Sequence, residues 1–238
     1  GSAADRHGPA RAAAGGPEVK GPATMAHHRL VKPPLLAECG IDAAIDLQRP
    51  GFCPAGGGEA TLRAAPSSLS PLDLDRRGDL ERVEIYSKAA ESLADGEVAD
   101  RQAESAREEL AAAGLPADVR RVAYVESDSP GSSLLLRGLY EEGLVGVDAL
   151  GERGRPSEVV AGDAVREFRA VHATDAAVDP FMADQLLIVL ALAGGRLRIP
   201  SLTDHVRTNL DLLARFGSDV EDERRADGTR IVEATALR

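Results

Sequence analysis

Alternating and helically spaced hydrophobic residues along the middle of the chain predict a strand–helix–strand–strand unit. The segment LERVEIYSK alternates apolar and polar residues, as a half-buried strand does. The helix that follows has a charged outer face and is followed by Gly114, a common stop signal. Ser129-Pro130-Gly131 is interpreted as a hairpin turn between the last two strands. The four expected elements span 80–88, 97–113, 119–126 and 132–139.

An almost wholly apolar helix is predicted further along the chain. Asp179 is a suitable N-cap and Pro180 fits the first helical position. Gly194 marks the end of the helix. The polar pair Asp184-Gln185 interrupts the apolar sequence. By pattern alone, the pair is a helix cap or a buried polar network.

A second helix is expected after a short strand at 197–199. Thr203 or Asp204 can cap it. His205 lies in its first turn, and Asn209 follows one turn later. From the pattern alone, His205 is a surface histidine.

The remaining elements are expected to be shorter or more polar. Residues 1–14 are low in complexity and are expected to form a disordered tail. A strand is predicted at 59–64, a helix at 157–171, and a charged turn with a last strand at 229–234.

Composition and length indicate a soluble globular protein. The chain has 238 residues and 43% hydrophobic residues, which suffices for a sizeable core in one or two domains. There is no apolar run of membrane-spanning length and no hydrophobic signal core. We therefore expect a cytoplasmic protein without a membrane partner.

The charge balance is acidic and depends on arginine. The net charge is −11, and the basic residues are 25 Arg and 3 Lys. Adaptation to high salt and a GC-rich genome explain this composition equally well. An acidic surface repels phosphates, so nucleic-acid binding would need a local arginine patch.

Cysteines and histidines give no metal motif. Cys39 and Cys53 are expected to be free thiols. His27 and His28 are adjacent, and adjacent side chains on a helix point apart, so surface histidines are favoured over a metal site.

Two motifs carry a family resemblance. The D-Q-L-L and A-L-A-G sequence that begins at Asp184, followed by H-x-x-T-N from His205, resembles the C-terminal signature of the RNA 3'-terminal phosphate cyclases. The segment 49–58 resembles the family's R-x-G-F-Y-P-x-G-G-G, with Cys53 in place of the aromatic residue. The segment from Gly151 resembles its G-E-x-G. The resemblance covers roughly 15–232.

The resemblance implies a fold and a domain organisation. It implies a mixed α/β (α+β) protein built from repeated βαβαββ units, the fold shared with the enolpyruvyl transferases. A small β-α-β-β insert domain is expected at 72–148, within a large domain formed by 15–71 and 149–238. The resemblance also implies that the chain lacks the family's N-terminal repeat, as expected of a truncated cyclase or one half of a split enzyme.

The resemblance also implies an ATP-dependent activity. His205 would be the nucleophile that takes AMP from ATP, with a divalent metal (Mg or Mn) offsetting the phosphate charge. Asp184 and Gln185 would line the nucleotide pocket. Phe181 would stack on the adenine, where relatives usually have Tyr, and Pro22 would pack on the adenine. The AMP would pass to an RNA 3'-phosphate end, which closes to a 2',3'-cyclic phosphate.

Two alternatives and two loops stay open at this point. The chain could be a non-catalytic RNA-binding or ribosome-assembly module, which the absent repeat favours and His205 disfavours. Self-association or a second polypeptide could supply the absent repeat. The glycines at 56–58 and 151–154 fit either tight turns or phosphate contacts.

Overall fold

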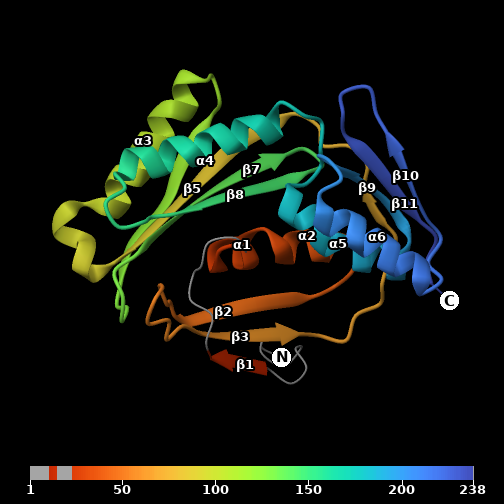
Figure 1. Ribbon diagram of the computed structural model, residues 1–238, viewed down its shortest axis with the longest axis horizontal. Helices are drawn as coiled ribbons and strands as arrows, with labels where there is room; N and C mark the ends of the chain where they lie inside the picture. Colours follow the sequence, from red (N-terminus) through yellow and green to blue (C-terminus); the bar gives the residue numbers. More distant parts are fainter. Residues whose placement is uncertain (1–10, 15–22, 238) are drawn as a thin grey trace, which may run out of the picture.

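The computed structural model is a mixed α/β protein, which confirms the expected fold class. It describes residues 11–14 and 23–237, and it contains three separate sheets. The helices lie between and beside the sheets (Figure 1). The strands are β1 (Arg11–Ala14), β2 (Ala43–Arg49), β3 (Glu59–Ala64), β4 (Leu72–Leu74), β5 (Leu80–Ala90), β6 (Ala117–Val125), β7 (Ser132–Tyr140), β8 (Leu144–Leu150), β9 (Gly195–Ile199), β10 (Val220–Arg224) and β11 (Arg230–Ala234). The helices are α1 (Met25–Leu30), α2 (Lys32–Glu38), the 3-10 helix η2 (Glu91–Gly96), α3 (Val98–Ala112), α4 (Ser157–His172), α5 (Pro180–Ala193) and α6 (Asp204–Arg215).

The middle of the chain forms a four-stranded sheet with the strand order β6-β5-β7-β8. Helices α3 and α4 cover one face of this sheet (Figure 1). Val83, Ile85, Leu110, Leu134 and Phe168 are fully buried between the sheet and the helices. The predicted strands and helix are all present, and β8 and α4 extend the unit.

The predicted hairpin between the third and fourth elements is wrong. Strand β5 lies between β6 and β7, pairing parallel with β6 and antiparallel with β7. The physical reason is the crossover through α3, which brings β6 back parallel to β5 and occupies one of its edges. Strand β7 therefore pairs with the other edge of β5, and Ser129–Gly131 belongs to a connection that spans β5.

The packing around this unit bears on the expected domain boundaries. Strand β4 at Leu72–Leu74 pairs with β9 in another sheet, and α4 completes the core of the middle sheet. The continuous unit of packing is therefore 80–172. We propose this range in place of 72–148 for the insert, and independent folding of either range stays a prediction.

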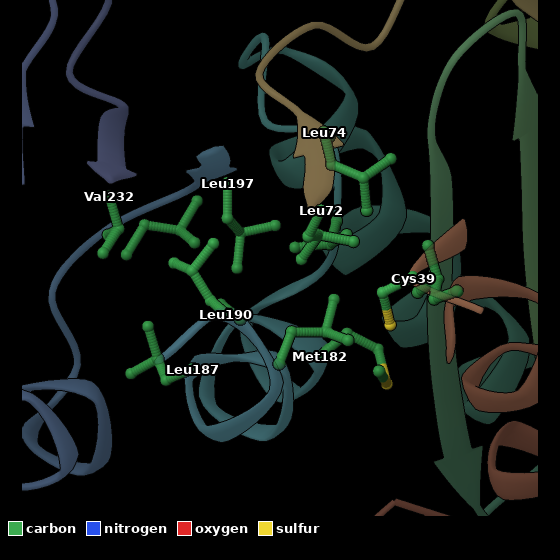
Figure 2. Packing of buried hydrophobic residues seen from close by; sticks show 14 of the residues in the cluster. Cys39, Leu72, Leu74, Met182, Leu187, Leu190, Leu197 and Val232 are labelled. Atoms are coloured by element: carbon green, nitrogen blue, oxygen red, sulfur yellow. The ribbon is translucent and has the colours of Figure 1, made fainter. Parts of the chain in front are cut away.

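The C-terminal part is organised around α5. Its apolar residues pack under the sheet β10-β11-β9-β4, and Figure 2 shows Leu187 and Leu190 of α5 facing Leu197 and Leu72. Gly195 has a φ of 114°, and a Cβ there would lie 2.0 Å from the carbonyl oxygen of Leu72. A residue without a side chain is thus required where β9 meets β4.

The predicted ends of this region are confirmed, with one strand added. Helix α5 begins after Asp179, and α6 begins after Thr203 rather than Asp204. The charged segment after Gly217 contains β10, which sequence patterning had placed in a turn. Its side chains are nearly all exposed, so no apolar alternation marks it. Among the residues that the structure describes, no helix is long and apolar enough to cross a membrane.

Candidate active site

A cavity of about 280 Å³ opens where five elements meet: the start of α1, strand β8, helix α4, and the N-terminal ends of α5 and α6. Three of the predicted site residues, Phe181, Asp184 and His205, line it together. Three further carboxylates, Asp148, Asp179 and Glu167, line it as well. Residues far apart in the sequence thus form one polar cavity.

Two helix caps place the predicted residues. Asp179 accepts a hydrogen bond of 2.8 Å from the backbone N–H of Met182, which fixes the first turn of α5 and with it Phe181. Thr203 accepts one of 3.2 Å from the N–H of Val206, so that His205 lies exposed in the first turn of α6. Pro22, the fifth predicted residue, lies outside the described residues.

Asp184 is the centre of a polar network that joins α5 to α6. The side-chain amide of Asn209 donates a short hydrogen bond to one carboxylate oxygen of Asp184. The Gln185 amide donates to the other oxygen at 3.3 Å, and Lys32 Nζ donates to Gln185 Oε1 at 2.8 Å. Gln185 therefore supports the cavity through Asp184.

Asn209 and Lys32 were not among the predicted site residues. Asn209 lies four residues after His205 and so on the same face of α6, which is the signal that could have identified it. Lys32 is separated from Gln185 by 153 positions, and no local pattern announces that contact.

The ring of Phe181 lies against two histidines. Its centroid is 5.2 Å from that of His27 and 5.4 Å from that of His28, in edge-to-face arrangements. The ring is thereby held in one orientation at the cavity wall. Stacking on a base stays a prediction.

The expectation that His27 is a surface histidine is wrong. His27 is 1% exposed, and its Nε2 donates to Asp179 Oδ2 at 3.1 Å. Burial alone would lower the pKa of His27, but the hydrogen bond and the negative charge of Asp179 outweigh it and raise the pKa. Adjacent residues on α1 do point apart, and the side facing α5 is interior.

The other titratable groups around His27 respond to the same burial. Burial, together with the nearby Lys32 and His27, lowers the pKa of His28 to about 4. Burial raises the pKa of Asp148, although the backbone N–H of Thr24 donates to its carboxylate at 2.6 Å. An ionised carboxylate on this wall of the cavity therefore costs free energy, and the positive charge of His27 offsets part of that cost.

The described residues contain no cluster of three or more His, Cys, Asp and Glu arranged to hold a metal ion. The oxygens of Asp179 accept from Met182, Gly146 and His27. Those of Asp184 accept from Asn209 and Gln185. These donor sets do not fit the protein-only metal site that a divalent cation would need.

The two glycine loops lie away from this cavity. Gly57 packs beside Asp128, which accepts a hydrogen bond from Arg49 at 2.7 Å, so this loop contacts the connection after β6. Gly151 and Gly154 line a separate cavity of about 530 Å³ near the first turns of α3 and α4. Cys39 and Cys53 are free thiols, as expected.

Replacing Asn209 with alanine is expected to weaken nucleotide binding at this cavity. The change removes the hydrogen bond that fixes the Asp184 carboxylate at the cavity, and we expect Kd to rise roughly tenfold, equivalent to about 1.4 kcal/mol. Equilibrium binding of a fluorescent adenine nucleotide measures the effect. Thr208→Ala is the control, because the Thr208 hydroxyl bonds its own helix at Asp204. Equal Kd values for the two variants would show that the Asn209–Asp184 hydrogen bond plays no part in nucleotide binding.

These features define a mixed α/β protein whose candidate site combines an exposed histidine, a supported carboxylate and an aromatic ring. A family model described as RTC, RNA 3'-terminal phosphate cyclase, matches residues 12–220. The chain belongs to this family.

Curated relatives agree with the family assignment. The chain is 42% identical over 220 residues to the RNA 3'-terminal phosphate cyclase of Halobacterium salinarum, an alignment that covers 92% of this chain and 62% of the relative. It is 36% identical over 206 residues to that of Pyrobaculum aerophilum, covering 85% and 59%. For Saccharolobus islandicus the identity is 33% over 202 residues, with 85% and 59% covered. The chain thus spans about three fifths of the length of these relatives.

Proposed function

We propose that this chain performs the nucleotidyl transfer of an ATP-dependent RNA 3'-terminal phosphate cyclase, with His205 as the nucleophile. The observation that carries the proposal is the shared cavity of Phe181, Asp184 and His205. Family membership and the activity for which the relatives are named support the reaction class.

The first step would be attack by an imidazole nitrogen of His205 on the α-phosphate of ATP. A P–N bond forms, the P–O bond to the β-phosphate breaks, and pyrophosphate leaves. The exposure of His205 gives the phosphate access. The N-terminal end of α6 presents backbone N–H groups that favour an anion. The helix that carries the nucleophile therefore also stabilises the charge it attacks.

The second and third steps would use the adenylate on His205. An oxygen of the RNA 3'-phosphate attacks the AMP phosphorus, and the P–N bond breaks. The neighbouring 2'-hydroxyl then attacks the 3'-phosphorus, loses its proton, and displaces AMP. The product is a 2',3'-cyclic phosphate. Covalent catalysis of this kind divides one difficult displacement into easier ones.

The residues around His205 would position the nucleotide. Asp184, held by Asn209 and Gln185, would accept hydrogen bonds from ribose hydroxyls. Phe181 would contact the adenine face, with its ring supported by His27 and His28.

Labelled ATP tests the proposal. Incubation with α-labelled ATP is expected to leave an acid-labile, alkali-stable label on the chain, whereas γ-labelled ATP leaves none. Addition of an RNA 3'-phosphate oligonucleotide should discharge the label as AMP. Absence of α-label under conditions in which the folded chain binds ATP would contradict nucleotidyl transfer.

A further inference from the structure

A second cavity, of about 340 Å³, lies on the other side of α1, and nothing in the proposed reaction uses it. Its floor is the face of the middle sheet opposite α3 and α4, and its wall is formed by α1 and the end of β2. Residues 27 and 29 of α1 are about 200° apart around the helix. His27 accordingly lines the candidate active site and Arg29 lines this cavity.

The lining of this cavity is basic in an acidic protein. Arg29, Lys88 and Arg121 line it, and none of the described residues that line it is Asp or Glu. Most arginines of the described chain lie within ion-pair distance of a carboxylate. Arg29 and Arg121 have no such partner among the described residues, and Arg29 Nε donates to the carbonyl of Ile45 at 3.1 Å.

Positive charge continues along the floor beyond the cavity. Tyr86, which lines it, donates to Glu84 at 2.8 Å. The buried Glu84 carboxylate is shared by Arg82 at 3.3 Å, Arg120 at 3.6 Å and Arg137 at 3.0 Å. Arg82 also lies 3.8 Å from Glu81. Three positive charges thus meet two negative ones, and the surplus of one extends the basic surface of Arg29 and Arg121.

A buried hydroxyl in the cavity lining points to a polar ligand. Ser133 is 2% exposed, lines the cavity opposite Lys88 on the neighbouring strand, and its Oγ makes no hydrogen bond in the described structure. A buried polar atom without a partner costs free energy, and such atoms are rare in folded proteins. An oxygen-rich ligand would satisfy this hydroxyl.

We propose that this cavity binds single-stranded RNA on the 5' side of the end that reacts at His205. The phosphates would contact Arg29 and Arg121, the Ser133 hydroxyl would donate to a ligand oxygen, and the apolar wall of Leu47 and Pro50 would contact a base. The volume lies at the small end of ligand pockets, about 300–1,000 Å³, so it takes a short piece of strand rather than a duplex. The choice of RNA over another polyanion rests on the proposed function.

Binding of a labelled oligoribonucleotide with a 3'-hydroxyl tests the site without chemistry, since that end cannot accept AMP. Arg121 is exposed on β6, so Arg121→Gln leaves the fold intact, and the double change with Arg29→Gln is expected to weaken binding further. Each lost phosphate contact lowers the salt slope of a single strand by about 0.7. Between 50 and 200 mM salt, the wild-type Kd should therefore rise roughly sevenfold more than that of the double variant.

The controls separate this site from general charge effects. Arg169→Gln changes an exposed arginine on α4, across the sheet, that has no ion pair among the described residues, and it should leave Kd and slope unchanged. Ser133→Ala removes an unsatisfied atom, so it should weaken RNA binding without lowering stability. If Arg29→Gln alters the fold, Arg29→Lys retains the charge and should retain most of the binding.

Three outcomes overturn the proposal: wild-type affinity in the double variant, equal losses in Arg169→Gln, or competition by inorganic phosphate or AMP as strong as that by RNA. The last would identify a site for free anions. Self-adenylylation, measured in parallel, distinguishes the two proposals. Wild-type protein that takes the label but does not bind the oligonucleotide would remove this site alone. Wild-type protein that binds the oligonucleotide but takes no label would remove the proposed function alone.

Discussion

Replacing His205 with glutamine is expected to abolish attachment of AMP to the chain. Glutamine keeps a polar side chain in the first turn of α6, so the cavity and the Asp184 network should persist. The nucleophilic nitrogen is lost, however, and removal of a covalent nucleophile lowers rates by about 10³-fold or more. Label from α-labelled ATP, measured after rapid quenching, should fall to background while nucleotide binding changes little.

His172→Gln is the matched control for this experiment. His172 lies at the end of α4, where its Nδ1 shares a hydrogen bond of 2.9 Å with the Tyr140 hydroxyl, and it does not line the cavity. It should label as wild type. Equal labelling of the His205→Gln variant and the wild-type protein would show that another residue carries the adenylate.

Sequence patterns correctly predicted the features that depend on residues close together in the chain. The caps at Asp179 and Thr203 and the end of α5 at Gly194 follow from short-range signals, and the structure confirms them. Six of the eleven strands in the described chain were predicted in the same way, whereas β1, β2, β4, β8 and β10 were not. The motif residues Phe181, Asp184 and His205 were proposed together from resemblance, and the structure places them in one cavity. Their roles in catalysis remain proposals.

Long-range contacts account for what the sequence could not predict. The pair of β6 with β7 was expected because the connection between them looks like a hairpin turn, yet strand pairing is decided by the crossover through α3. His27 was expected on the surface, because nothing near it in sequence shows that Asp179 covers it. Strand β10 pairs with β11 through backbone groups, although four of its five side chains are charged and exposed.

The largest loss of stability is expected from Asp179→Ala. Asp179 is 1% exposed and accepts from Met182 at 2.8 Å, from Gly146 at 2.9 Å and from His27 at 3.1 Å. The change leaves the buried His27 without its acceptor, and removing one partner of a buried ion pair costs about 3–5 kcal/mol. Urea denaturation should show that loss in the free energy of unfolding.

Thr203→Ala measures the loss of stability that comes from removing a helix cap alone. Thr203 caps α6 through the N–H of Val206 but has no ionic partner, and loss of such a cap costs about 1 kcal/mol. If Asp179→Ala costs no more than Thr203→Ala, the His27–Asp179 pair contributes nothing beyond the cap. Asp179→Asn, which keeps a capping oxygen and removes the charge, should fall between the two.

The ion pair should also give wild-type stability a characteristic dependence on pH. Because the pKa of His27 is raised above 6.5, its folded state binds a proton more tightly than the unfolded state. The stabilisation is fully present below pH 6.5 and is lost as pH rises through the folded-state pKa. The free energy of unfolding should therefore decline above pH 6.5, and the decline should be absent in Asp179→Asn.

The neighbouring groups differ from His27 in the direction or in the starting point of their pKa shifts. His28 and His172 have lowered pKa values, so their contributions change below pH 6.5 and have the opposite sign. The raised pKa of Asp148 starts from 3.8, that of Glu167 from 4.5, and that of Cys39 from 9.0. The lowered pKa of Lys32 starts from 10.5. Lys32 is therefore replaced by methionine in both the wild-type and the Asp179→Asn protein, which removes its titration. Denaturation curves between pH 6.5 and 9 then report on His27, and the same slope in both proteins would show that His27 is neutral beside Asp179.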